Sequence, residues 1–165
     1  MTASDAASRP KISEQLADDI QAAVEKTFLQ MFALEVKASF EAVNQEVQPS
    51  GDVSGIISLI QGEQVGSLIV TFPQATLFNI LKVFYKREFT EVDRVVGMAV
   101  GEISNIIFGV FKYRVGQKGF SFNMVVPNVA VGSSRVSGTN WTLVGKFTSP
   151  QGDFTVLLSR GADLK

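Results

Sequence analysis

The sequence predicts an α+β domain in which a layer of three helices covers a mostly antiparallel sheet of about six strands. Along the 165-residue chain the hydrophobic period alternates between helical and strand-like, which gives the order α-βββ-αα-βββ. The expected strands are joined by short turns, which connect antiparallel neighbours. There is neither βαβ alternation nor a glycine-rich phosphate loop, and this argues against a nucleotide-binding α/β fold.

The first half of the chain is expected to supply one helix and three strands. Residues 1–10 are expected to be a flexible N-terminal tail, and residues 11–165 a single domain. A first helix should begin with Ser13 as its cap and end near residues 32–34. Alternating and short apolar runs predict strands over residues 36–47, 53–60 and 65–72, the last two forming a hairpin.

The second half is expected to supply two helices and the remaining strands. Pro73 suits the first turn of a short helix that runs to about residue 85. Thr90 and Asp93 resemble a capping box, so a long helix is expected over residues 90–114, with glycines ending it. The predicted strands are 120–126, 129–131, one from residue 136 or 141 to 147, and 154–159. The order hints at an internal duplication, but the two halves share too little sequence to establish it.

The composition excludes several classes of chemistry. The chain has no cysteine and no histidine, so thiol nucleophiles, disulfides, Cys/His zinc sites and histidine general bases are excluded. A net charge of −1, with no basic run longer than two residues, gives no reason to expect nucleic acid. We find no secretion signal and no apolar run of about 18 residues, so we expect a cytoplasmic protein without membrane binding.

The candidate site is a polar pair on the long helix, Glu102 and Asn105. At about 100° per residue, valines, isoleucines and alanines fill one arc of this helix, and the polar pair lies on the other. Residues three apart are neighbours on a helix surface, so the two side chains should lie side by side. The alternative is an ordinary solvated helix face, which is the common meaning of this spacing.

Two local features favour a function for this face. Asparagine is a poor residue for a helix interior, and Gly97, Gly101 and Gly109 each cost ~1 kcal/mol there relative to alanine. The glycines indicate either an approaching partner surface or tight packing inside the fold, and the sequence leaves both open. An amide can hold a water in line with an electrophile, and such orientation serves phosphoryl transfer. Because the pair holds neither phosphate nor metal, a partner would have to supply both.

These residues carry a resemblance to a known family. Gly-Glu-Ile-Ser-Asn at 101–105, then Gly109, the run 120–126, Pro127 and Gly132 resemble the signature of the CheC/CheX/FliY phosphatases of bacterial chemotaxis. The resemblance covers roughly residues 12–160. With one Glu/Asn pair, it is to CheX and single-motif CheC-like proteins rather than to CheC, which has two such helices.

The resemblance implies a phosphatase that acts on the aspartyl phosphate of a CheY-like response regulator. Asn105 would orient the attacking water, and Glu102 would pair with the active-site lysine of the regulator. The chain would need no cofactor of its own, because the regulator supplies Mg²⁺. One position departs from the family pattern, since Met98 stands where Asp or Ser is usual.

Two alternatives accompany this hypothesis. One is a non-catalytic adaptor that binds a receiver domain, or a scaffold like the flagellar switch protein FliM, whose middle domain lacks the Glu/Asn pair. The other concerns assembly: CheX-like members form dimers through their sheets, so a homodimer is a candidate state. A small-molecule-binding domain has no motif behind it.

Overall fold

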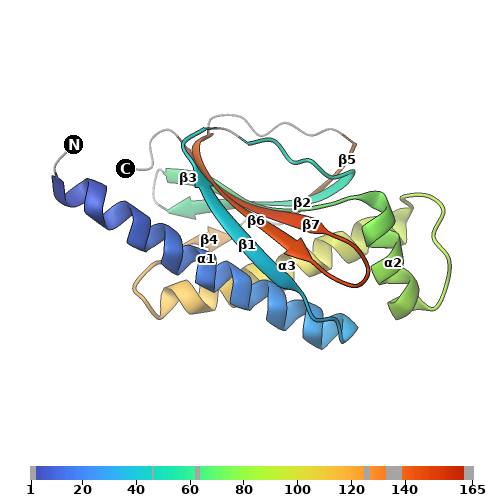
Figure 1. The fold of residues 1–165 in the computed structure, drawn as a ribbon. Coiled ribbons are helices and arrows are strands. Elements are labelled where there is room, and N and C mark those ends of the chain that lie inside the picture. Colours follow the sequence, from blue (N-terminus) through green and yellow to red (C-terminus); the bar gives the residue numbers. More distant parts are fainter. Residues whose placement is uncertain (1–2, 46, 62–63, 125–126, 133–138, 162–165) are drawn as a thin grey trace.

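The computed structural model describes residues 3–45, 47–61, 64–124, 127–132 and 139–161 as one α+β domain (Figure 1). Its helices are α1 (Ala3–Phe32), α2 (Gln74–Tyr85) and α3 (Arg94–Gly116). Its strands are β1 (Lys37–Val43), β2 (Val53–Gln61), β3 (Gln64–Phe72), β4 (Asn123–Met124), β5 (Asn128–Val131), β6 (Thr139–Thr148) and β7 (Phe154–Gly161). The predicted fold class and element order are confirmed.

All strand pairs are antiparallel, and the sheet runs β1-β6-β7-β3-β2, with β4 and β5 sharing the outer edge of β2. Seven strands therefore occupy six positions, which agrees with the six expected. β5 begins directly after Pro127, which lacks the N–H that a continuous strand would use. The β2 edge at which β5 pairs becomes important below, because it lies beside α3.

Several predicted boundaries were wrong. α1 begins at Ala3, ten residues before the expected cap at Ser13. β1 ends at Val43 instead of residue 47. The expected strand over 120–126 is reduced to Asn123–Met124, since Phe120–Phe122 lie outside a strand and 125–126 lie outside the described residues. The proposed strand start at Val136 also lies outside them. The division into a flexible tail and one domain stays a prediction, because helical geometry does not measure mobility.

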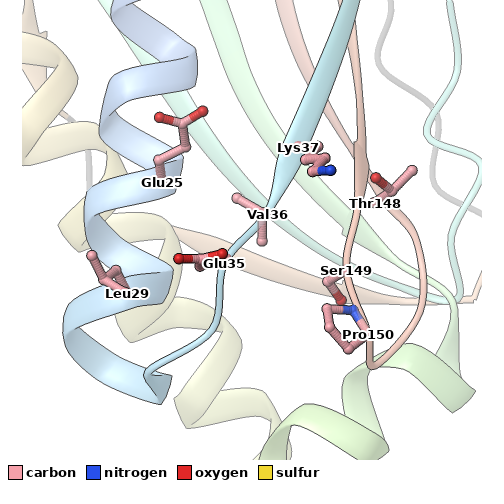
Figure 2. A pocket seen from close by; sticks show the side chains of 8 residues that line it. All are labelled: Glu25, Leu29, Glu35, Val36, Lys37, Thr148, Ser149 and Pro150. Carbon is pink, nitrogen blue, oxygen red and sulfur yellow. The ribbon is translucent and has the colours of Figure 1, made fainter.

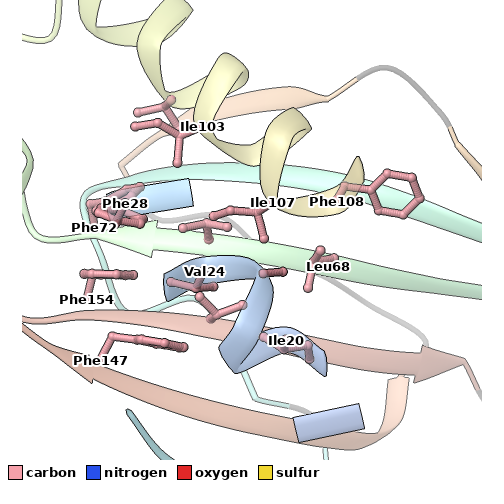
Figure 3. Close-up of a cluster of buried hydrophobic side chains, with 14 of the residues drawn as sticks. Ile20, Val24, Phe28, Leu68, Phe72, Ile103, Ile107, Phe108, Phe147 and Phe154 are labelled. Atoms are coloured by element: carbon pink, nitrogen blue, oxygen red, sulfur yellow. The ribbon is translucent and has the colours of Figure 1, made fainter. Parts of the chain in front are cut away.

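The hydrophobic core lies between the helices and one face of the sheet (Figure 3). Phe28 of α1 stacks on Phe154 of β7 with ring centroids 4.8 Å apart, and Phe147 stacks on Phe154 at 5.2 Å. Ile103 and Ile107 of α3 are fully buried in the same cluster. The apolar arc predicted for the long helix is therefore the surface that fixes α3 to the sheet.

The strand registers reveal the internal duplication that the sequence only hinted at. In the β2–β3 hairpin Ser54 lies opposite Thr71, and in the β6–β7 hairpin Thr142 lies opposite Ser159. All four hydroxyl side chains are buried. Because β3 and β7 pair antiparallel in the middle of the sheet, each hairpin has its counterpart across an approximate twofold axis. α1 and α3 are the corresponding helices of the two halves.

A glycine lets α3 approach the sheet closely at the level of the candidate site. Ser104 is fully buried and donates its hydroxyl to the carbonyl of Val100 at 2.7 Å. Opposite it on β2 stands Gly55, where an added Cβ would lie 1.9 Å from Ser104 Oγ. Gly55 is therefore required by close approach, as glycine inside a strand often is. The contact, which lies between Glu102 and Asn105 in the sequence of α3, fixes the distance of the helix from the sheet and its rotation about its own axis.

We expect Gly55→Ala to destabilise the protein by roughly 1–3 kcal/mol, because the new methyl group overpacks a buried contact that cannot open to solvent. The free energy of unfolding in urea measures this. Gly97→Ala is the matched control: a Cβ there meets nothing within 4 Å, so it should stabilise α3 by about 1 kcal/mol. Equal stability of Gly55→Ala and the wild type would contradict the close contact.

Candidate functional site

The site is carried by α3, whose first turn is fixed by Asp93. The Asp93 carboxylate accepts a hydrogen bond from the backbone N–H of Val96 at 3.0 Å. It also forms an ion pair with Arg87 at 2.7 Å. Asp93 is thus the N-cap, and the prediction that Thr90 caps the helix was wrong by three residues. The hydrogen bond from Val96 is the main cause that lowers the pKa of Asp93, and Arg87 adds to it.

The end of α3 is held by both backbone and side-chain contacts. The N–H of Phe120 bonds to the Val115 carbonyl at 3.0 Å, with Gly119 between them at φ +91°, as in a Schellman motif. Beside it, the fully buried carboxylate of Asp19 on α1 accepts from Arg114 at 3.0 Å and from Lys118 at 2.9 Å. Both ends of the helix are therefore anchored, and the residues between them form a rigid platform.

Glu102 and Asn105 lie on the solvent side of this platform, as predicted, and both side chains are exposed. Their one-turn spacing places their Cβ atoms about 5–6 Å apart. Ser104, between them in sequence, points the other way into the core. The pair is therefore presented outward together, on an open helix face rather than in a pocket.

The helix glycines are not explained by packing inside the fold. A Cβ at Gly97 or Gly109 would meet nothing within 4 Å, and one at Gly101 would only reach ordinary contact, 3.6 Å from Val129 of β5. Of the two interpretations that the sequence left open, close internal packing is absent at these positions. A smooth backbone surface beside Glu102 and Asn105 remains, and it suits the approach of another molecule.

The residues present do not fit a resident metal. No group of three or more carboxylates gathers in the part of the chain that the structure describes. Glu102 is the single carboxylate on its stretch of α3, and a divalent ion such as Mg²⁺ needs several oxygen ligands. Alone, the pair can donate and accept hydrogen bonds and present one negative charge. It can orient a water or a cation but cannot hold a phosphate.

The corresponding face of α1 lacks this pair. The buried residues of α1 have the same spacing as those of α3: Leu16, Asp19, Ile20, Ala23, Val24, Thr27 and Phe28 correspond to Val96, Ala99, Val100, Ile103, Ser104, Ile107 and Phe108. Counted from these residues, Ala22 and Glu25 take the places of Glu102 and Asn105. Neither side chain can orient a water as an amide does, so the described part of the fold carries one site and not two.

A cleft on the α1 side is the other candidate location (Figure 2). It is open and lies between α1 and the starts of β1 and the β6–β7 turn. It is lined by Glu25, Leu29, Glu35, Val36, Lys37, Thr148, Ser149 and Pro150. Its charged groups are two carboxylates and one lysine, on separate elements and in open surroundings, and the Glu25 carboxylate already accepts a hydrogen bond from the Gln21 amide at 2.8 Å. We assign the function to α3 because the cleft offers no comparable arrangement.

Sequence reasoning missed the residues that position the pair. Gly55 and Ser104 were not singled out, although an isolated glycine within a strand pattern is a recognised signal of close approach. Val129 and Val131 of β5 were assigned only to a strand. Their relation to α3 depends on the pairing of β5 with β2, and local sequence patterns do not encode that pairing.

By length and composition alone, α3 could cross a membrane: it has 23 residues, and a window of 18 of them has a mean hydropathy of 1.5. No other helix in the described ranges meets this test. α3 has no unbroken apolar run of about 18 residues, but its valines, isoleucines and phenylalanines outweigh the polar residues between them. Its fully buried residues belong to the core of this domain, as in the core helix of a globular protein.

The chain is similar to known chemotaxis proteins. Residues 53–140 match the family model described as chemotaxis phosphatase CheX. None of the curated proteins matches significantly. A CheC-like superfamily protein from Shewanella sp. PV-4 has 22% identity and a TM-score of 0.77, covering 90% of this chain and 98% of that one.

Two further solved structures share the fold. CheX from Vibrio vulnificus has 23% identity and a TM-score of 0.75, covering 88% of this chain and 98% of its own. A CheX from Borrelia burgdorferi, in a complex with CheY, BeF₃ and Mg²⁺, has 22% identity and a TM-score of 0.68, covering 87% and 96%. At these identities the structural likeness establishes the fold alone.

We expect Asp93→Ala to weaken folding at neutral pH, since it removes the cap of the helix that carries the site. The pKa of Asp93 is lower in the folded chain, so its ionised form favours folding. That contribution is complete above the ordinary value of 3.8 and is lost as the pH falls through the lowered one. The urea midpoints of wild type and variant should therefore converge in acid.

Asp93→Asn is the control for this prediction, because its amide oxygen can still accept from Val96 without a charge. It should retain most of the stability at neutral pH. A difference between wild type and Asp93→Ala that stays constant from neutral to strongly acid pH would contradict the role of the ionised cap.

Proposed function

The chain belongs to the CheX family of chemotaxis phosphatases, and we propose that it hydrolyses the aspartyl phosphate of a CheY-like response regulator. The observation that carries this proposal is the exposed pair of Glu102 and Asn105 on an anchored helix. The relative that was solved together with CheY and Mg²⁺ supports a partner of the same kind. The phosphate and the metal would both arrive with the regulator.

In the proposed mechanism Asn105 positions the nucleophile. Its side-chain carbonyl accepts a hydrogen bond from a water, and its NH₂ group can donate to a phosphoryl oxygen. The water oxygen forms a bond to phosphorus while the bond between phosphorus and the aspartyl oxygen breaks. The water protons pass to the departing inorganic phosphate, and the aspartate of the regulator is left as a carboxylate. The gain comes from orientation, which needs neither a histidine nor a cysteine on this chain.

Glu102 has a separate role in the proposal, which is to orient the partner. Its carboxylate can accept a charge-assisted hydrogen bond from the active-site lysine of the regulator. Because Glu102 stands one turn from Asn105, this bond would fix the distance between the amide and the phosphorus atom. Both partners would act in the cytoplasm, where response regulators receive their phosphate.

We expect Asn105→Ala to lose most of the acceleration of dephosphorylation, on the order of 10²-fold, because one preorganised polar group at the reacting centre is removed. Phosphate release from a panel of phosphorylated CheY-like regulators measures this. Leu29→Ala is the control, since Leu29 is 56% exposed on α1 and lies in the cleft beside the start of β1, away from the pair. It should leave the rate unchanged.

The same assay separates the proposal from the non-catalytic alternative. A regulator that binds the wild-type protein but keeps its phosphate at the spontaneous rate would indicate an adaptor or scaffold. Full activity in Asn105→Ala would instead rule out the assigned mechanism.

We expect Glu102→Gln to lower kcat/KM by about tenfold, because the glutamine keeps the shape of the side chain but loses the charge that pairs with lysine. The effect should appear mainly in KM and should shrink at high salt, which screens the interaction at an exposed site. An unchanged salt dependence would count against the pairing with a cation.

A further inference from the structure

The site is bordered on one side by an exposed apolar patch made of Met98, Val129 and Val131. These side chains are 64%, 36% and 64% exposed, respectively. Met98 lies one helical turn before Glu102 on the same face of α3. The two valines come from β5, the strand that shares the outer edge of β2 with β4.

The strand register shows that both valines face α3. Val129 pairs with Gly55, and Val131 pairs with Val53. Cross-strand partners point to the same face of a sheet, and the side of Gly55 that lacks a Cβ faces Ser104 of α3. Val129 in turn is the nearest side chain to Gly101, at 3.6 Å from a built Cβ. Gly101 thus lies on the helix surface between the apolar patch and the polar pair.

A partner that reaches Asn105 must cover this patch. A specific interface takes about 800 Å² from each protein, which extends well beyond a single helical turn around Asn105. Met98 is two turns from Asn105, and Val129 touches the intervening Gly101. Covering exposed apolar side chains favours association, whereas facing them with a charge or an unpaired polar group opposes it.

We propose that the patch of Met98, Val129 and Val131 is the recognition surface of the site, and that it selects regulators with an apolar surface beside their phosphorylated aspartate. This rests on the proposed function. The flexible thioether of Met98 adapts its shape to the facing side chain. Polar substitution there would admit a different set of regulators. The occupant is therefore the receiver domain itself, and the patch is continuous with the catalytic pair.

The test measures binding apart from turnover. Phosphorylated CheY-like regulators are titrated against the Asn105→Ala variant, which should bind without consuming its ligand. On this background Met98→Asp and Val131→Asp should each weaken binding by about tenfold or more, as expected for a charge placed in a covered apolar contact. Met98→Leu should retain the affinity. Leu29→Asp is the control, because Leu29 is equally apolar and exposed but lies near β1, at the opposite edge of the sheet.

In the Asn105-containing protein, the same aspartate substitutions should raise KM and leave kcat nearly unchanged. Binding and KM that stay at the wild-type value in Met98→Asp and Val131→Asp, while wild type dephosphorylates the regulator, would overturn the patch and spare the proposed function. A regulator that binds through the patch without losing its phosphate would support the patch and contradict the proposed function. If no regulator in the panel binds, both proposals fail.

Discussion

The arrangement of the site depends on one contact, the seat of Ser104 of α3 against Gly55 of β2. A helix on a sheet is free to slide and rotate unless a specific feature stops it, and apolar burial alone is not directional. The missing side chain at Gly55 creates a depression that only a small residue can enter. Because Ser104 lies between Glu102 and Asn105, this lock sets the direction of both functional side chains. The Asp93 cap and the bonds of Arg114 and Lys118 to Asp19 then hold the two ends.

The platform has half of what phosphoryl transfer requires. It supplies orientation through an amide and one carboxylate, and it lacks ligands for a metal and groups that bind phosphate. In the proposed function, such a division leaves specificity to whatever surrounds the pair, because Glu102 and Asn105 alone would suit any receiver. The apolar side chains of β5 and Met98 surround the pair on one side. An exposed helix face, rather than a pocket, is the geometry expected when the substrate is a folded domain.

Much of this could be predicted from the sequence, because strong signals are local. The period of Val96, Val100, Ile103 and Ile107 predicted the buried arc of α3, and the same period placed Glu102 and Asn105 on its outer face. The predictions failed where two local signals compete or where pairing decides. Thr90 and Asp93 are both good N-caps, and the hydrogen bond to Val96 selects Asp93. Which of residues 120–124 form a strand depends on where they pair with β2, and no pattern within that segment predicts this pairing.

The two halves of the sheet bury equivalent residues, yet of their two corresponding helices only α3 displays a Glu/Asn pair in the described residues. Symmetry of the frame is maintained by the core, where Ser54 and Thr71 mirror Thr142 and Ser159. The outward positions are free of that constraint, so Ala22 and Glu25 can differ from Glu102 and Asn105 without loss of folding. In a fold made of two similar halves, the outer face of α1 can acquire new side chains while the outer face of α3 stays unchanged. Glu25, which takes the place of Asn105 on that second face, lines an open cleft.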